Sequence, residues 1–293
     1  MTAEDRSIAG HPDVERLVTL ALEEDLGDAG DVTSRSLVPP HAVAAGCIVA
    51  KEDLVMAGHD VAAVVFQCVN DTLAYQQCVP DGARATSGDV VATVEGPAGS
   101  MLTAERTALN FLQRLCGIAT LTSRFVDAVA GSGVRILDTR KTTPGMRRLE
   151  KYAVTCGGGD NHRFGLYDRV LIKDNHRRFW VTDGIPTLDA AVRVARRDCP
   201  GIPLEVEVES EEELSSALQA DPDWVLLDNM TPEQLKACVT LCGGRAQLEA
   251  SGGITLRTVA AVAASGVDAI SLGCLTHSAP AVDLSLEISP MAR

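Results

Sequence analysis

The chain has 293 residues, a formal net charge of −14, 46% hydrophobic residues and only 3% aromatic residues. So acidic a protein is a poor partner for nucleic acid or for an anionic membrane surface, and we expect neither. The core must consist mainly of Ala, Val, Leu and Ile, which is typical of helices packed on buried parallel strands. The length suits a barrel of about 250 residues, or a smaller barrel with a second domain.

The cysteine pattern and the N-terminus favour a cytoplasmic protein. Nine cysteines are scattered along the chain without a Cys-x-x-Cys pair, as in a reducing compartment. Cys238 and Cys242 could hold a metal together, but no second Cys or His pair lies nearby, so we interpret them as small apolar filler. The first residues lack the basic and apolar regions of a secretion signal, and no uncharged apolar run approaches the ~18 residues of a membrane helix.

The N-terminal part predicts a small α+β domain. An amphipathic helix over 11–26 ends at Gly27. Strands and one further helix follow, with the strands at 44–51, 73–79 and 89–94 and the helix at 59–69. Strands around one helix without βα alternation favour an α+β sandwich. We place it at 1–116, with the C-terminal segment 278–293 as a candidate addition.

Residues 102–129 are helix-permissive except at Cys116-Gly117, so we expect two helices that bridge to a second domain. Thr103 is the expected cap of the first helix, which puts Glu105 and Arg106 in its first turn. Because adjacent helical residues do not face each other, each of these two should reach a different partner.

From residue 135 onward, short apolar runs alternate with helical segments. The predicted strands are 135–138, 170–173, 204–208, 224–227, 247–249 and 269–272. Helix starts are expected at a capping box over Ser210–Glu213, at Thr231–Gln234 with a first-turn proline, and at Thr255. This alternation predicts a parallel α/β barrel of about six or seven strands, open or complete, over 117–277. A doubly wound open sheet is the alternative fold.

A basic segment stands out in this acidic chain. Residues 135–178 contain 11 of the 26 Lys and Arg but only five acids, so the rest carries about −20 by the same count. Such a focused positive island favours a small ligand with several negative charges. Arg147, Arg148 and Lys151 have helical spacing and could form an exposed face. Five other cations lie at strand ends or beside glycines, where functional groups are usual: Arg140, Lys141, His162, Arg163 and Lys173.

Polar residues follow every predicted strand, at the edge where a parallel barrel places its active site. They are Asp138, Arg140, Lys141, Lys173, Glu205, Glu207, Glu209, Asp228, Glu249, Ser251, Gly252, Gly253, Gly273 and His277. The three glutamates of 205–209 alternate with valines, so they share one face of a strand and need cations from Lys141, Lys173 or Mg²⁺. Asp228 is a natural second Mg²⁺ carboxylate. The small residues at 251–253 and 273, each before an expected helix, favour a phosphate site over an ordinary turn.

Nine segments together resemble the quinolinate phosphoribosyltransferase family, the decarboxylating nicotinate-nucleotide pyrophosphorylases of NAD synthesis. They are Glu-Glu-Asp-Leu-Gly to Gly-Asp-Val-Thr-Ser (23–34), Leu-Thr-Ala-Glu-Arg-Thr-Ala-Leu-Asn (102–110), Asp-Thr-Arg-Lys-Thr-Thr-Pro-Gly (138–145), Lys-Tyr-Ala-Val to Gly-Gly-Gly-Asp-Asn-His-Arg (151–163), Leu-Ile-Lys-Asp-Asn-His (171–176), Glu-Val-Glu-Val-Glu (205–209), Leu-Leu-Asp-Asn (226–229), Glu-Ala-Ser-Gly-Gly-Ile (249–254) and Gly-Cys-Leu-Thr-His-Ser (273–278). They cover nearly the whole chain in the family's order. The loop 177–186 departs from the family pattern, and its conformation is not predicted.

The resemblance implies two substrates, quinolinate and phosphoribosyl pyrophosphate (PRPP), with Mg²⁺ as cofactor. Quinolinate would bind Arg140, His162, Arg163 and Lys173, with Arg106 from the other subunit of a homodimer, a dimer that could assemble further. PRPP would bind Lys141, Glu207, Asp228, Glu249, Ser251, Gly252, Gly253, Gly273 and His277. Glu207 and Asp228 would also hold the metal, and Lys141, Lys173, Glu207 and Asp228 would carry the chemistry.

Two other functions remain open on the sequence. A paralogue with a different activity, such as the molybdenum-transport-associated proteins that resemble this family, should lack the cations that bind the two carboxylates of quinolinate. Here all of them are present: Arg106, Arg140, His162, Arg163 and Lys173. The phosphoribosyltransferase class with a nucleotide-type open sheet is disfavoured, because its acidic pair before a Gly/Thr-rich phosphate loop is missing.

Overall fold

The computed structural model describes residue 8 and the ranges 10–180 and 187–291. The chain forms two compact units. Unit 1 combines 1–123, 142–158 and 274–293, and unit 2 combines 124–141 and 159–273. In the described ranges, no helix has both the length and the apolar character needed to cross a bilayer.

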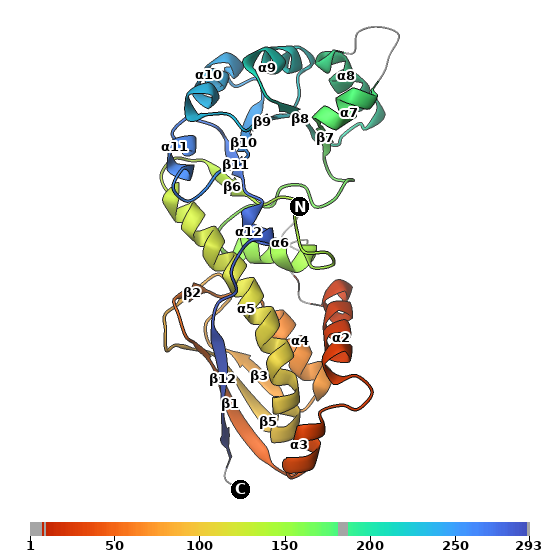
Figure 1. Ribbon diagram of the computed structural model, residues 1–293, viewed down its shortest axis with the longest axis vertical. Helices are drawn as coiled ribbons and strands as arrows, with labels where there is room; N and C mark the ends of the chain where they lie inside the picture. The colour runs from red at the N-terminus through yellow and green to blue at the C-terminus, as the bar shows by residue number, and fades with distance from the viewer. Residues whose placement is uncertain (1–7, 9, 181–186, 292–293) are drawn as a thin grey trace. The chain divides into compact units, whose positions relative to one another are not determined.

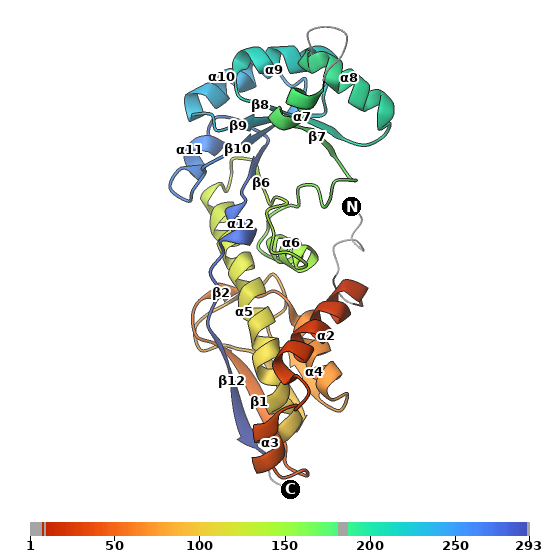
Figure 2. The same cartoon turned by 45° about the vertical axis from the view of Figure 1, so that its right-hand side comes forward.

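Unit 1 is built on a four-stranded antiparallel sheet in the order β12-β1-β5-β3. Its strands are β1 (Val43–Ala50), β3 (Ala74–Gln77), β5 (Val90–Pro97) and β12 (Leu284–Pro290), and β2 (Leu54–Val55) pairs separately with β4 (Arg84–Ala85). Its helices are α2 (Pro12–Leu26), α3 (Val32–Leu37), α4 (His59–Val69), α6 (Arg147–Cys156) and α12 (Cys274–His277), together with most of α5 (Ala98–Ala128). Helix α5 runs along one face of the sheet (Figures 1 and 2), where Met101 lies close to Gly46 of β1.

The predicted break at Cys116-Gly117 is wrong, because α5 is one continuous helix of 31 residues. A Cβ at Gly117 would lie 2.0 Å from the carbonyl oxygen of Pro280, so this glycine allows a backbone segment to approach the helix closely. Thr103 is not a cap either, since it lies inside the helix and donates its hydroxyl to the Gly99 carbonyl at 2.9 Å. A glycine needed for close packing therefore looks like a helix end in the sequence.

Unit 2 is a six-stranded parallel sheet in the order β6-β11-β10-β9-β8-β7. The strands are β6 (Arg135–Leu137), β7 (Val170–Ile172), β8 (Leu204–Val208), β9 (Trp224–Asp228), β10 (Gln247–Ser251) and β11 (Ala269–Ser271). The first strand lies beside the last and the others follow in chain order, which is the winding of a barrel left open between β6 and β7. The predicted open α/β barrel is therefore confirmed, and the doubly wound sheet is not found.

Short helices follow the strands on the outer side of this sheet (Figure 2). They are α7 (Asp174–Phe179), α8 (Leu188–Asp198), α9 (Glu211–Ala217), the 3₁₀ turn η1 (Leu218–Ala220), α10 (Pro232–Cys242) and α11 (Val259–Ala263). Part of the loop 177–186 is thus the end of α7, and residues 181–186 lie outside the described residues. Cys238 and Cys242 are both buried on α10, as expected for apolar filler.

One of the two expected capping boxes forms completely. Thr231 and Gln234 bond reciprocally at the start of α10, at 2.9 and 3.3 Å. Ser210 caps α9 by accepting the Glu213 N–H at 3.2 Å, but the Glu213 carboxylate accepts the N–H of Glu209 at 3.0 Å and not that of Ser210. The Ser210 box is therefore only half correct.

Candidate active site

A cavity of about 380 Å³ lies in unit 2 at the carboxyl ends of the strands. It is lined by Thr139, Arg140, Lys141, His162, Arg163, Leu171, Lys173, Glu207, Leu226, Asp228, Glu249, Ser251 and Ser271. The barrel thus brings together side chains from all six strands or the segments that directly follow them, which are far apart in sequence. Most of the residues predicted for the site line this one cavity.

The cavity gathers cations at close range. Burial, and next the positive charge of Arg140, lower the pKa of Arg163. Its Nη1 donates to the Arg169 carbonyl at 3.3 Å, which holds the guanidinium in place. A cation whose pKa is lowered by burial and a neighbouring positive charge is stabilised when an anion binds beside it. The cavity is therefore electrostatically prepared for a multiply negative ligand.

His162 is fixed by two buried carboxylates. Its Nε2 lies 3.0 Å from Glu205 Oε2 and 3.2 Å from Glu249 Oε2. Burial lowers the pKa of His162, but the bonds to Glu205 and Glu249 outweigh it and raise the pKa to about 9. The backbone N–H of Arg163 donates to His162 Nδ1 at 2.7 Å. This bond disfavours a proton on Nδ1 and so favours the neutral ring protonated on Nε2. Two carboxylates against one backbone amide favour the imidazolium at neutral pH.

Glu205 pairs with Arg169, a cation that we did not predict for the site. Arg169 Nη1 lies 3.2 Å from Glu205 Oε2, and the guanidinium stacks 5.0 Å from the centroid of the Trp224 ring. We expected Lys141, Lys173 or Mg²⁺ to neutralise the glutamates. Lys173 does pair with Glu207, at 2.9 Å, but Glu205 pairs with His162 and Arg169. Arg169 directly precedes β7, whereas the prediction considered only residues that follow a strand.

The carboxylates of Glu207 and Asp228 fit a divalent cation. Burial, and next the negative charge of Glu207, raise the pKa of Asp228. Lys173 balances part of this charge through Glu207, and Asn229 Nδ2 donates to Asp228 Oδ2 at 2.7 Å. Mg²⁺ binds protein through one or two carboxylates and keeps its other positions for water and substrate oxygens, which suits this pair.

A second acidic group is a poor metal site. His162, Glu205 and Glu249 have ligand atoms within 4.8 Å of one another. However, His162 Nε2 carries a proton in both of its relevant forms, and Arg169 already balances Glu205. A metal would have to displace that proton and compete with that guanidinium. We therefore interpret the group as support for His162.

A glycine turn follows Ser251 at the end of β10. Gly252 has φ +96° and Gly253 has φ +61°, and a Cβ on Gly252 would lie 2.1 Å from Asn229 Oδ1. The turn is therefore packed directly against the end of β9, as a loop that presents backbone N–H groups to a ligand requires. The expected helix does not start here: α11 begins only at Val259, so the prediction that Thr255 caps it is wrong. Thr258 is the residue before α11, and its hydroxyl accepts the Thr255 N–H at 3.0 Å.

Three further predicted residues lie at or beyond the edge of unit 2. Gly273 is the last residue of that unit and directly precedes α12. His277 ends α12 in unit 1, is exposed, and has Nδ1 2.6 Å from Ser278 Oγ. Arg106, also in unit 1, has a side chain that is 61% exposed and lies 4.0 Å from Glu105. Arg106 lies well inside α5 and not in its first turn, where we had expected it. The expectation that Glu105 and Arg106 would not pair is also wrong, although their 4.0 Å separation is the longest that counts as an ion pair.

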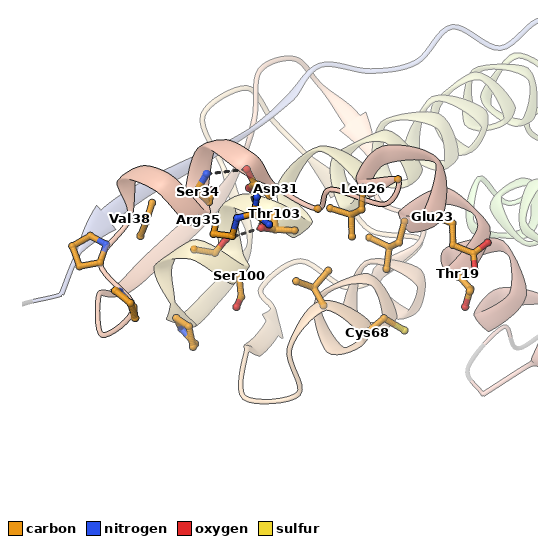
Figure 3. A pocket seen from close by; sticks show the side chains of 18 residues that line it. Thr19, Glu23, Leu26, Asp31, Ser34, Arg35, Val38, Cys68, Ser100 and Thr103 are labelled. Carbon is orange, nitrogen blue, oxygen red and sulfur yellow. Dashed lines mark hydrogen bonds between the residues drawn. The ribbon is translucent and has the colours of Figure 1, made fainter.

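Unit 1 contains a larger cavity, of about 940 Å³, between α2, α3 and the beginning of α5 (Figure 3). Asp31 accepts the Ser34 N–H at 2.9 Å and the Thr103 hydroxyl at 3.0 Å beside it. Among the described residues that line it, Arg35 is the one basic side chain, and its guanidinium donates to the Ala29 carbonyl. Without a cluster of cations this larger cavity does not suit a dianion, so the smaller cavity of unit 2 is the candidate active site.

Comparison with known proteins agrees with the charge pattern. The models for the N-terminal and C-terminal domains of quinolinate phosphoribosyl transferase match residues 31–116 and 118–287. The nicotinate-nucleotide pyrophosphorylase (carboxylating) of Mycobacterium leprae is 44% identical over 92% of this chain and 94% of its own length. The probable enzyme of the same name from Bacillus subtilis is 39% identical over 95% and 94%.

Solved structures give the same result. NadC from Streptococcus pyogenes aligns with a TM-score of 0.91 and 38% identity, covering 98% of this chain and all of that one. The nicotinate-nucleotide pyrophosphorylase of Francisella tularensis aligns with a TM-score of 0.89 and 36% identity, covering 97% and 99%. The resemblance found in the sequence is thereby confirmed: the chain belongs to the quinolinate phosphoribosyltransferase family.

Proposed function

We propose that the unit 2 cavity carries out the reaction of this family, the transfer of the phosphoribosyl group from PRPP to quinolinate with decarboxylation. The products are nicotinate mononucleotide, CO₂ and pyrophosphate, in the de novo synthesis of NAD. The observation that carries this proposal is the meeting of five cations with three carboxylates, those of Glu207, Asp228 and Glu249, in one cavity at the carboxyl ends of the strands. That arrangement suits a dianion beside a polyphosphate ester with its metal.

Quinolinate binds the cations of the cavity. Arg140, His162, Arg163 and Lys173 pair with its two carboxylates, and charge-assisted bonds of this kind contribute about 1.5–3 kcal/mol each. Arg106 reaches the same ligand from the other subunit of a homodimer, a role supported by the exposure of its guanidinium.

PRPP occupies the side of the cavity that carries the carboxylates and the glycine turn. Lys141 binds its pyrophosphate, and Ser251, Gly252, Gly253 and Gly273 bind its 5-phosphate, with His277 as a further contact. Glu207 and Asp228 hold Mg²⁺ and the ribose hydroxyls, and Glu249 contributes from β10. When bound, Mg²⁺ offsets the charge of the pyrophosphate leaving group.

The chain's residues stabilise charge at both steps. In the first, the pyridine nitrogen attacks the anomeric carbon while the bond to pyrophosphate breaks. Positive charge develops on the ribose near Glu207 and Asp228, and Lys141 stabilises the departing oxygens. Lys173, paired with Glu207 at 2.9 Å, keeps that carboxylate aimed into the cavity. In the second step, the carboxylate beside the ring nitrogen leaves as CO₂; its electron pair stays on the ring carbon, stabilised by the cationic nitrogen, and a proton from solvent replaces it.

The cytoplasm is the proposed compartment. All nine cysteines are free thiols, including the exposed Cys68 and Cys78, which suits a reducing environment.

A product assay tests the proposal. The protein is mixed with quinolinate, PRPP and Mg²⁺, and nicotinate mononucleotide and CO₂ are followed together. We expect the two products in equal amounts and only with the metal present. Mononucleotide without CO₂, or no turnover by folded protein, would contradict the proposal; in the latter case the cavity would bind some other dianion, as in a paralogue with a different activity.

A further inference from the structure

We propose that Arg114 and Glu150 of unit 1 are positioning residues for the PRPP half of the site, acting through the backbone next to Lys141 and His277. The inference rests on the proposed binding of PRPP by Lys141, Gly273 and His277. Neither Arg114 nor Glu150 lines the cavity of unit 2. They bind backbone just after two of the four places where the chain passes between the units, namely 141/142 and 273/274.

Glu150 binds the loop that follows Lys141. It lies on α6 and its side chain is completely buried. Its Oε2 accepts the backbone N–H of Thr143 at 3.0 Å, and its Oε1 accepts the Thr143 hydroxyl at 2.8 Å. Thr143 is only two positions from Lys141, and the chain leaves unit 2 between Lys141 and Thr142. The Glu150 carboxylate therefore fixes the backbone two residues after Lys141.

Arg114 connects this carboxylate to the segment that follows the crossing at 273/274. Its Nη2 lies 2.7 Å from Glu150 Oε1, and its Nη1 donates to the Ala279 carbonyl at 2.8 Å. Nη2 also donates to the carbonyl of Thr276, the residue just before His277. The chain re-enters unit 1 after Gly273, at the start of α12, and α6 and α12 lie side by side in both views (Figures 1 and 2).

The chemistry of the pair explains why it would hold these segments firmly. A carboxylate that is fully out of water needs its partners, because leaving it unpaired costs several kcal/mol. Its donors come from α5 and from an irregular loop, so the loop has one favourable position. No regular element contains Thr143, and the hydrogen bonds to Glu150 replace the support that a helix or strand would give.

The effect should fall on one substrate more than on the other. Lys141 and His277 adjoin the segments held by the pair, and both are assigned to PRPP. His162, Arg163 and Lys173, which are assigned to quinolinate, lie on the segment 159–173 of unit 2, whereas the bonds described above hold residues 143 and 276–279. Arg140 is the one quinolinate cation that adjoins Lys141. Removing a bond of the pair should therefore raise the KM for PRPP by a larger factor than the KM for quinolinate.

Thr143→Val is the sharpest perturbation, because it removes the hydroxyl bonded to Glu150 and keeps the side-chain volume. We expect the KM for PRPP to rise by about tenfold, since small misplacements of a binding group have effects of that size. Thr143→Ser keeps the hydroxyl and should restore the wild-type value. Thr155→Val is the matched control, because that hydroxyl on α6 donates to the Tyr152 carbonyl and not to Glu150.

Each full-length variant is assayed for both KM values and for its melting temperature. An unchanged ratio of the two KM values in Thr143→Val would overturn the inference, even if the melting temperature falls. So would a rise in the KM for PRPP in Thr143→Ser and Thr155→Val that equals the rise in Thr143→Val. Glu150→Gln provides a second test, with a larger rise in the same KM. Wild-type activity reports on the proposed function separately: an inactive wild type refutes that function, whereas an active wild type with an indifferent Thr143→Val refutes only the positioning role.

Discussion

Replacing Arg163 by alanine should weaken quinolinate binding far more than it weakens the fold. The Arg163 guanidinium donates to the Arg169 carbonyl at 3.3 Å, a single bond to a neutral partner, so its loss should cost about 1 kcal/mol of stability. A charge-assisted bond to a ligand carboxylate contributes about 1.5–3 kcal/mol. Because 1.4 kcal/mol corresponds to a factor of ten, the KM for quinolinate should rise by roughly 10- to 150-fold.

Steady-state kinetics at saturating PRPP measures this change. Arg163→Lys, which keeps the charge but loses the planar fork, should fall between the alanine variant and the wild type. The control is Arg197→Ala, an exposed arginine of the same unit whose guanidinium lies 2.7 Å from Asp198. A KM for quinolinate within about twofold of normal in Arg163→Ala would refute the assigned role, because no transition-state or ground-state binding would have been lost.

Three other predictions test separate parts of the account. Glu207→Ala should lower turnover by at least about tenfold and raise the Mg²⁺ concentration needed for half-maximal rate; normal activity would place the metal elsewhere. Because the folded-state pKa of His162 is raised from 6.5 to about 9, its charge is present below that pH and is lost above it, so kcat/KM for quinolinate should fall as pH rises through about 9. A flat profile would mean that the neutral ring is the binding form. Gly117→Ala should lower the free energy of unfolding by about 1–3 kcal/mol in urea titrations, because its Cβ meets Pro280, whereas Gly99→Ala in the same helix should not.

The barrel was predictable because its strands are short apolar runs of regular spacing. All six were located from the sequence to within about two residues, the usual accuracy of a boundary. The shared face of Glu205 and Glu207 also followed from simple alternation, and both side chains are largely buried. Glu209, expected on the same face, lies just after the end of β8 and is exposed. The gathering of Arg140 and Arg163 in one cavity needed only the rule that parallel strands end at the same edge.

The errors arose where tertiary contacts decide local structure. Gly117 interrupts the helical pattern of the sequence, yet the close approach of Pro280 makes a glycine necessary inside an unbroken helix. Thr255 looks like a cap, but the glycine turn before it delays the start of α11. Arg169, directly before β7, pairs with Glu205 of β8, a contact that depends on the register of these two strands and not on local sequence. Roles assigned to individual residues from the family resemblance stay predictions.

The central claim is that the cavity recognises a dicarboxylate, and comparison of quinolinate with nicotinate tests it most directly. Nicotinate lacks the carboxylate beside the ring nitrogen, so it would leave part of the cationic cluster of the cavity without a ligand carboxylate. A site built to bind such a group rejects the analogue that lacks it by about 10⁴- to 10⁵-fold. We therefore expect kcat/KM for quinolinate to exceed that for nicotinate by at least about 10⁴. Comparable values for the two acids would contradict it.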